Sequence, residues 1–308
     1  MPVFNSLTSP ERIVADFYIM LREEIRNGNP LLSEDENALL RSHYETMLRY
    51  MNLPPEIAGA VYTARRIPPV REIQKTDNPF VFDAGCGYGS ESFLFAFLGT
   101  RVVAVDREAQ IDIAKKRQVY YENKFQKKLD VEFVAGDLND FIPPAGLSLT
   151  WLASVLAAIP DQNNFLKKVY QATRPGGAVM ITDMNILNPL FMFGEWKRRC
   201  RGRKRSADFA KNANFWAMLF RKGRIGARYF LCEDGSCFDD VQFFSGRSLS
   251  QLCREIGFLP QVIHVGYGPP GFIGNTARAL TILNKIPVIS ELGYFYLVTG
   301  YKGGLNVI

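Results

Sequence analysis

A short glycine-rich segment after an apolar strand constrains this chain more than any other feature. Residues 81–90 read V-F-D-A-G-C-G-Y-G-S, which predicts a strand, a loop and the start of a helix. The three glycines of the loop are Gly85, Gly87 and Gly89. Glycine lets the backbone approach a ligand closely, because no Cβ stands in the way. The next predicted strand, residues 101–105, leads into Asp106, and an acid there can accept both hydroxyls of a ribose. Together these signals predict a nucleoside-cofactor site on a Rossmann-like sheet.

The glycine spacing separates two classes of cofactor. The dinucleotide fingerprint requires G-x-G-x-x-G, and this chain has Ser90 where the third glycine is required. The run D-A-G-C-G-Y-G instead resembles the first motif of the class I S-adenosylmethionine (SAM)-dependent methyltransferases, which has the form acidic-x-G-x-G-x-G. In that family the second strand also ends in a ribose-binding acid, the position that Asp106 takes here.

The order of the signals that follow strengthens this resemblance. A third short strand, residues 131–135, leads into Gly136-Asp137, and a fourth is predicted over residues 147–154. A helix over residues 161–173 is then followed by R-P-G-G at 174–177, a predicted turn, because glycine ends helices and proline cannot continue them. A fifth strand, residues 178–183, comes next. The resemblance covers about residues 78–183 closely and the rest more loosely.

The resemblance implies an α/β, Rossmann-like methyltransferase fold with a seven-stranded, mostly parallel sheet. Its last two strands, predicted over residues 258–265 and 294–302, would form an antiparallel hairpin at the sheet edge. It also implies SAM as cofactor, with Asp137 facing the adenine amino group, the next backbone amide facing the ring and Asp83 orienting the ammonium group. The positions so assigned to cofactor binding are Asp83, Gly85, Cys86, Gly87, Gly89, Asp106, Arg107, Asp137, Leu138 and Ala153.

The chain divides into a helical N-terminal part and a larger cofactor domain. With 308 residues, of which 47% are hydrophobic, it can bury a full core. Residues 1–70 are predicted as a helical cap, with helices starting at Ser9-Pro10, at Ser33 and running to about Tyr50, and at Pro54. Pro68-Pro69 is expected to break the last helix before the sheet. Residues 71–308 form the SAM-binding domain, interrupted at about 186–240 by an insertion after the fifth strand. We expect cap and insertion to cover the site as a lid.

Positive charge is concentrated in that insertion. The net charge is +6, yet residues 195–228 alone carry +10 and the remainder −4. The segment could be a solvated helix face, a nucleic-acid patch or a membrane-surface element. Phe191, Phe193, Trp196, Phe215 and Trp216 flank the charges. These aromatic blocks favour a lipid or lipid-linked acceptor, with peripheral contact to an anionic membrane, over RNA. A phosphate on the acceptor is another use for the arginines.

Methyl transfer needs few side chains, because the donor is already activated, and no catalytic residue is assigned. Alignment and exclusion of water supply much of the rate, and a base is needed only if the acceptor must lose a proton. Many small-molecule O-methyltransferases of this type carry a histidine after the fourth strand, but residues 154–160 hold no titratable group. His43 could act as a base or be an ordinary helix histidine, and His264 is expected to be structural. Tyr18 and Tyr44 could line the pocket or belong to the core.

Five scattered cysteines without a C-x-x-C pair indicate free thiols, a reducing compartment and no metal site. A Cys232–Cys237 disulfide across a predicted hairpin turn is a less favoured alternative. The N-terminus lacks a basic-then-apolar signal, and no run of about 18 apolar residues exists. We therefore expect a cytoplasmic protein, with peripheral membrane contact left open.

The sequence as a whole predicts a SAM-dependent enzyme that methylates a small-molecule or lipid-like acceptor, mainly through proximity and desolvation. Two alternatives stay open. The chain could be a nucleic-acid methyltransferase that holds its substrate with the basic insertion, or a catalytically silent SAM-binding partner protein. The acceptor, the methylated atom and the oligomeric state are not determined by the sequence.

Overall fold

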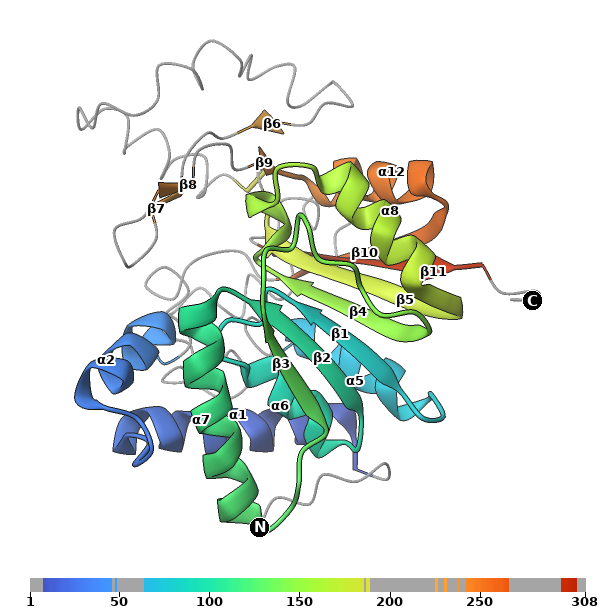
Figure 1. Ribbon diagram of the computed structural model, residues 1–308. Coiled ribbons are helices and arrows are strands. Elements are labelled where there is room, and N and C mark those ends of the chain that lie inside the picture. Colours follow the sequence, from blue (N-terminus) through green and yellow to red (C-terminus); the bar gives the residue numbers. More distant parts are fainter. Residues whose placement is uncertain are drawn as a thin grey trace, which may run out of the picture.

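The computed structural model describes residues 8–45, 48, 64–185, 187–188, 225–226, 230–231, 237–238, 242–265 and 295–303. Its centre is a seven-stranded sheet with the order β10-β11-β5-β4-β1-β2-β3 (Figure 1). The strands of this sheet are β1 (Phe80–Ala84), β2 (Arg101–Asp106), β3 (Val131–Ala135), β4 (Leu147–Ala153), β5 (Thr173–Met184), β10 (Phe258–Val265) and β11 (Phe295–Lys302).

Helices cover the sheet and short strand pairs stand apart from it (Figure 1). The α-helices are α1 (Pro10–Asn27), α2 (Glu34–His43), α5 (Ile67–Gln74), α6 (Ser90–Phe97), α7 (Glu108–Phe125), α8 (Gln162–Ala172) and α12 (Gly246–Ile256). Two 3₁₀ turns are η2 (Ala64–Arg66) and η3 (Leu156–Ala158). The two-stranded pairs are β6 (Ile225–Gly226) with β9 (Gln242–Phe243), and β7 (Phe230–Leu231) with β8 (Cys237–Phe238).

The sheet confirms the predicted architecture. β5, β4, β1, β2 and β3 are parallel to their neighbours, whereas β11 runs antiparallel between β5 and β10. The carboxyl ends of four adjacent parallel strands, β4, β1, β2 and β3, therefore lie along one edge of the sheet. In open α/β sheets ligands bind at this edge.

The strands are apolar at successive positions because both faces of the sheet are covered. Val81, Val102 and Trp151 belong to the core under α1, α5, α6 and α7, whereas Phe82 and Val103 belong to the core under α8 and α12. Alternate residues of each strand thus enter opposite cores, as the two-residue repeat of a strand requires.

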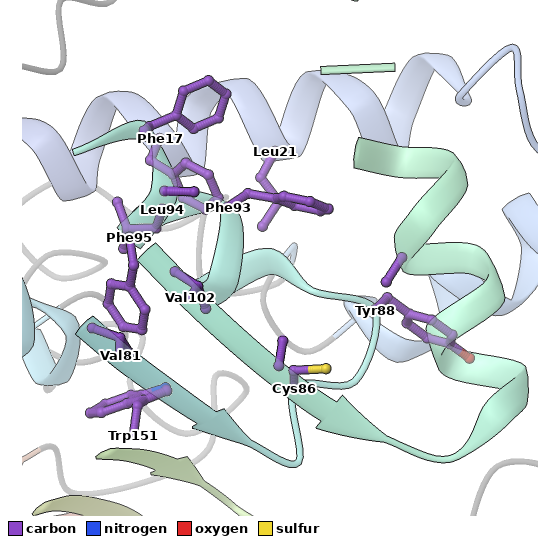
Figure 2. Packing of buried hydrophobic residues seen from close by; sticks show 14 of the residues in the cluster. Phe17, Leu21, Val81, Cys86, Tyr88, Phe93, Leu94, Phe95, Val102 and Trp151 are labelled. Atoms are coloured by element: carbon purple, nitrogen blue, oxygen red, sulfur yellow. The ribbon is translucent and has the colours of Figure 1, made fainter. Parts of the chain in front are cut away.

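The N-terminal helix α1 is part of the first of these cores. Figure 2 shows Phe17 and Leu21 of α1 against Phe93 and Leu94 of α6, with the sheet beneath. Phe17 and Leu21 are both wholly buried. Burying a large apolar side chain contributes roughly 1.5–3 kcal/mol, so α1 is fixed on α6. Whether residues 1–70 act as a lid stays a prediction.

Two local predictions were wrong. Pro68-Pro69 does not mark the end of helical structure before the sheet but lies in the first turn of α5, where prolines are tolerated because those N–H groups have no intrahelical acceptor. The segment 174–177 is not a turn but the irregular start of β5. Thr173 pairs with Leu147 and Ala178 with Leu149, so β5 bulges against β4. The backbone pairing of Thr173 ends α8 at Ala172.

One further predicted helix has a different end in the structure, and several predictions concern residues outside the described part of the chain. The second helix ends at His43 rather than near Tyr50. The predicted helix from Pro54 and most of the basic insertion lie outside the described residues, as does Cys232. The described backbone pairs Leu231 with Cys237, which agrees with the predicted hairpin. Among the described helices, none is long and apolar enough to cross a membrane.

Candidate functional site

The loop between β1 and α6 is held against the end of β2 by backbone hydrogen bonds. The N–H groups of Gly85 and Cys86 both donate to the carbonyl of Val105, at 2.9 and 3.1 Å. The Gly89 N–H then donates to the Cys86 carbonyl at 2.9 Å, which turns the chain into α6. The glycine loop, residues 85–89, therefore has a fixed shape at the carboxyl edge of the sheet.

The glycines are required by both backbone conformation and space. Gly85 and Gly89 have φ angles of +72° and +81°, a region that residues with a Cβ rarely adopt. A Cβ on Gly85 would stand 2.3 Å from Val155, and one on Gly89 would stand 2.7 Å from Phe133. The loop backbone thus lies directly against the segment after β4 on one side and against β3 on the other.

Asp106 connects β2 to this loop. Its Oδ2 accepts from the Gly87 N–H and its Oδ1 from the Arg107 N–H, both at 2.7 Å. A carboxylate offers about four acceptor sites, so two hydrogen bonds leave capacity for the two hydroxyls of a ribose. The side chain is only partly buried. The position and remaining acceptor capacity of Asp106 therefore fit the ribose of a nucleoside cofactor.

The neighbouring strands complete the edge. Asp137 follows β3 and is exposed, and its Oδ1 accepts from the N–H and the side-chain amide of Asn139, at 2.8 and 2.7 Å. Leu138, next to it, is buried. Ala153 ends β4 and pairs with Thr182 of β5. The structure thus places the sequence-predicted residues on adjacent strand ends, and their roles in cofactor binding stay predictions.

Asp83 and Cys86 are two buried ionisable groups at this edge. The Asp83 carboxyl accepts a hydrogen bond from Ser92 Oγ at 2.5 Å. Burial nevertheless raises the pKa of Asp83 to about 8, so the carboxyl holds a proton at neutral pH. Burial also raises the pKa of the Cys86 thiol well above its usual value. Cys86 is therefore a neutral group in the loop. The described residues hold no cluster of three or more His, Cys, Asp or Glu that could bind a metal ion.

A buried ion pair behind the loop was not foreseen from the sequence. Arg117 of α7 and Glu24 of α1 form two hydrogen bonds, Nε to Oε1 at 2.9 Å and Nη2 to Oε2 at 2.6 Å, and both side chains are fully buried. Arg117 Nη1 also donates to the carbonyl of Tyr88, within the glycine loop, and to Ser90 Oγ. Burial opposes the charge on Glu24, but Arg117 holds the pKa of Glu24 below its usual value. The pair anchors the loop to two helices.

A second ion pair lies at the start of α6. Glu91 accepts from Arg66 at 2.9 and 2.7 Å and from the Tyr18 hydroxyl at 3.0 Å. Burial opposes its charge, but Arg66 lowers the pKa of Glu91 overall. Tyr18 is 1% exposed. The structure therefore supports the alternative that Tyr18 is a core tyrosine.

The remaining candidates are His43, Tyr44 and His264. Tyr44 is buried and its hydroxyl forms a short hydrogen bond with Ser90 Oγ. His43 ends α2 and its imidazole lies beside Gly87. His264 lies on β10, at the far edge of the sheet from β3. Of these candidates, His43 is the one whose side chain the structure shows beside a glycine of the loop.

Comparison with known proteins agrees with this geometry. A family model described as "Methyltransferase domain" matches residues 75–228. Malonyl-[acyl-carrier protein] O-methyltransferase of Serratia marcescens is 27% identical over 106 residues, which cover 34% of this chain and 38% of that protein. Trans-aconitate 2-methyltransferase of Azoarcus sp. (strain BH72) is 27% identical over 151 residues, which cover 46% and 56%. The chain thus spans roughly two fifths to just over half of the length of these curated relatives.

Solved structures with similar chains include a SAM-dependent methyltransferase of Thermotoga maritima, described as a possible histamine N-methyltransferase. It is 14% identical with a TM-score of 0.48, over 86% of this chain and 97% of that one. DhpI in complex with SAH is 16% identical with a TM-score of 0.47, over 95% and 98%. The family model spans half of the chain, and the sheet has the strand arrangement that the motifs imply. The chain therefore belongs to the methyltransferase domain family, within the class I SAM-dependent methyltransferases.

Proposed function

We propose that the protein transfers a methyl group from SAM to a small-molecule acceptor, free or lipid- or carrier-linked, that bears a carboxylate. The observation that carries the proposal is the meeting of the glycine loop, Asp106 and Asp137 on adjacent strand ends. In this proposal Asp106 accepts the ribose hydroxyls. Asp137 and the Leu138 amide recognise the adenine. Asp83 orients the ammonium group.

A carboxylate acceptor fits a segment after β4 that offers no general base. SAM, when bound, supplies a methyl group that is already activated on a sulfonium. A carboxylate oxygen has no proton to lose at neutral pH, so its methylation needs no general base. Residues 154–160, after β4, contain no titratable group. The names of both relatives denote acceptors with a carboxylate, malonyl-acyl carrier protein and trans-aconitate. The residues of this chain then have to bind, orient and exclude water.

Cofactor binding is tested by calorimetry with SAM and SAH. Asp106→Ala should weaken binding by about 1.5–3 kcal/mol, the value of hydrogen bonds to a charged group. The matched control is Asp112→Ala, which removes an exposed aspartate from α7. Equal affinity of wild type and the Asp106 variant would contradict the site assignment, and so would tight binding of NADH.

The acceptor class is tested with SAM labelled in the methyl group. The protein is incubated with labelled SAM and with di- and tricarboxylic acids, free or carrier-linked. These acids should become labelled methyl esters, which release labelled methanol in alkali. Label that enters RNA would favour the nucleic-acid alternative. SAM binding without transfer to any acceptor pool would favour a silent SAM-binding protein. We further propose a cytoplasmic location with peripheral contact to anionic membranes, which rests on the charge and cysteine pattern of the sequence alone.

A further inference from the structure

His43 lies beside the glycine loop, against the ring of Tyr88. If Gly87 carried a Cβ, that atom would lie 3.6 Å from Nε2 and 3.7 Å from Cε1 of His43, which is ordinary van der Waals contact. The imidazole meets the rings of Tyr44 and Tyr88 edge to face, with centroids 4.7 and 4.9 Å away. The ring is therefore placed between two tyrosines, with one edge over the middle glycine of the loop.

Helix α2 is held at both of its ends by contacts with α6 and α7, so this placement is not that of a loose surface residue. Tyr44, the C-cap of α2, bonds to Ser90 Oγ, the first residue of α6. Lys116 of α7 bonds to Glu36 of α2 at 2.6 Å. Helix α2 itself begins with a capping box at Ser33, which fixes its start. The position of His43 is therefore determined by the fold.

The environment keeps the imidazole neutral while leaving part of it accessible. Part of the His43 side chain is exposed to solvent. The protein atoms packed around the imidazole nevertheless reduce its hydration. This desolvation lowers the pKa of His43 below its usual value. The charge of Arg117 lowers the pKa further, while Glu91 and Asp106 act against the shift. A neutral imidazole has one donor and one acceptor nitrogen, and it does not repel a sulfonium.

We propose that His43 is a cofactor-binding residue that contacts SAM on the ribose side of the glycine loop. The proposal rests on the proposed function. Gly87 is the residue whose N–H donates to Asp106, so the His43 ring stands beside the residue that holds the proposed ribose-binding carboxylate. A histidine that served only to pack α2 on the loop would not need an exposed surface at this point. Its nitrogen offers the bound cofactor a hydrogen bond that Asp106, an acceptor only, cannot donate.

The test uses the fact that the chain has only two histidines, His43 and His264. In protein labelled at the histidine ring carbons and nitrogens, NMR should show two imidazoles, and His264→Asn assigns them. Titration with SAH should shift the ring signals of His43 and leave those of His264 unchanged. His43→Asn should weaken SAH binding about three- to tenfold, the effect of losing one hydrogen bond. His264→Asn, the matched control, should bind SAH like wild type.

Packing is separated from hydrogen bonding by His43→Phe, which keeps an aromatic ring between Tyr44 and Tyr88. The Phe variant should melt near the wild-type temperature and still lose SAH affinity like the Asn variant. Wild-type SAH affinity in both variants, with no change of the His43 signals on titration, would overturn the proposal. A change in kcat alone, at unchanged SAH affinity, would overturn it as well, because His43 would then act on the acceptor. If wild type itself does not bind SAH, the proposed function has failed instead.

Discussion

Burial distinguishes Asp83 from Asp106 and Asp137, the other acids assigned to the cofactor site. Asp106 and Asp137 are partly or fully exposed, whereas Asp83 is 2% exposed and holds its proton up to a pKa of about 8. A cationic ammonium group brought to this carboxyl would favour the ionised form. Binding of the cofactor is therefore expected to release a proton from Asp83 at neutral pH.

The same proton makes stability depend on pH. The pKa of Asp83 rises from 3.8 in the unfolded chain to about 8, so the folded state binds the proton more tightly. The contribution of Asp83 to the free energy of unfolding is therefore complete below the unfolded pKa of 3.8. It is lost as pH rises toward the folded pKa of about 8. Asp83→Asn mimics the protonated acid and should remove the dependence. Between pH 5 and 7, wild-type stability should fall relative to the variant by about 1.4 kcal/mol per pH unit. Urea unfolding of both proteins measures this, and parallel pH profiles would refute it.

At this scale the sequence predicted the motif residues that meet at the strand ends, but neither their protonation states nor their contacts with distant helices. The motif around Gly85 and the acid at Asp106 depend on neighbours in the chain, so they could be read directly. The pKa of Asp83 depends on burial under helices that the motif does not specify. The position of His43 beside Gly87 brings together residues 44 positions apart through helix packing, and no local pattern encodes it.

Among the structural elements, α1 and α7 are joined by a buried ion pair that also holds the loop. Taking charges out of water is costly, so such a pair is a poor source of stability but a strong constraint on geometry. Arg117 fixes the Tyr88 carbonyl only while Glu24 balances its charge. The pair thus couples the N-terminal helix to the glycine loop.

Breaking this pair from either side should be costly. Glu24→Gln or Arg117→Met should each lower the free energy of unfolding by about 3–5 kcal/mol, because one buried charge is left unpaired. The double variant Glu24→Leu/Arg117→Met should recover part of that loss, because Asn29 and Tyr121 still lose Glu24 as their acceptor. It should also bind SAH poorly, since the Tyr88 carbonyl has lost its donor. The exposed pair Glu11–Arg71, at 3.0 Å, is the control, and its removal should cost about 0–1 kcal/mol. Denaturant titration gives the stabilities. Normal SAH affinity in the double variant would speak against a role for the pair in the loop.

Strand order was predictable from the sequence, whereas several helix ends were not. The strands follow apolar runs bounded by glycine or acid, such as 101–105 before Asp106. The prediction was wrong at Pro68-Pro69 and at R-P-G-G, residues 174–177, because a proline in either place is compatible with two local structures. Proline starts a helix as readily as it ends one, and a bulge tolerates it as a turn does. At residues 174–177 the pairing of Thr173 with Leu147 of β4 makes the segment a bulged part of β5 rather than a turn.

For the molecule as a whole, charge is the property least tied to the fold. Residues 195–228 carry +10 and lie mostly outside the described residues, so their role stays a prediction from the sequence. Each Lys or Arg near an anionic membrane contributes about 1 kcal/mol, so three or four in contact give measurable adsorption. Anionic vesicles should therefore co-sediment the protein at low salt and release it at high salt. Replacing Arg198, Arg199, Arg201 and Arg203 by Ser should abolish this and leave SAM affinity intact. Absence of wild-type binding at low salt would exclude the lipid interpretation.

The position of β11 has a consequence for biosynthesis. It is the last of the seven strands in chain order, yet it lies between β5 and β10. About 110 residues separate the end of β5 from the start of β11. At ribosomal rates of about 5–20 residues per second, the nascent chain leaves the edge of β5 open for roughly 5–20 s. An unpaired strand edge attracts other chains, so this interval is when the newborn protein most needs a chaperone.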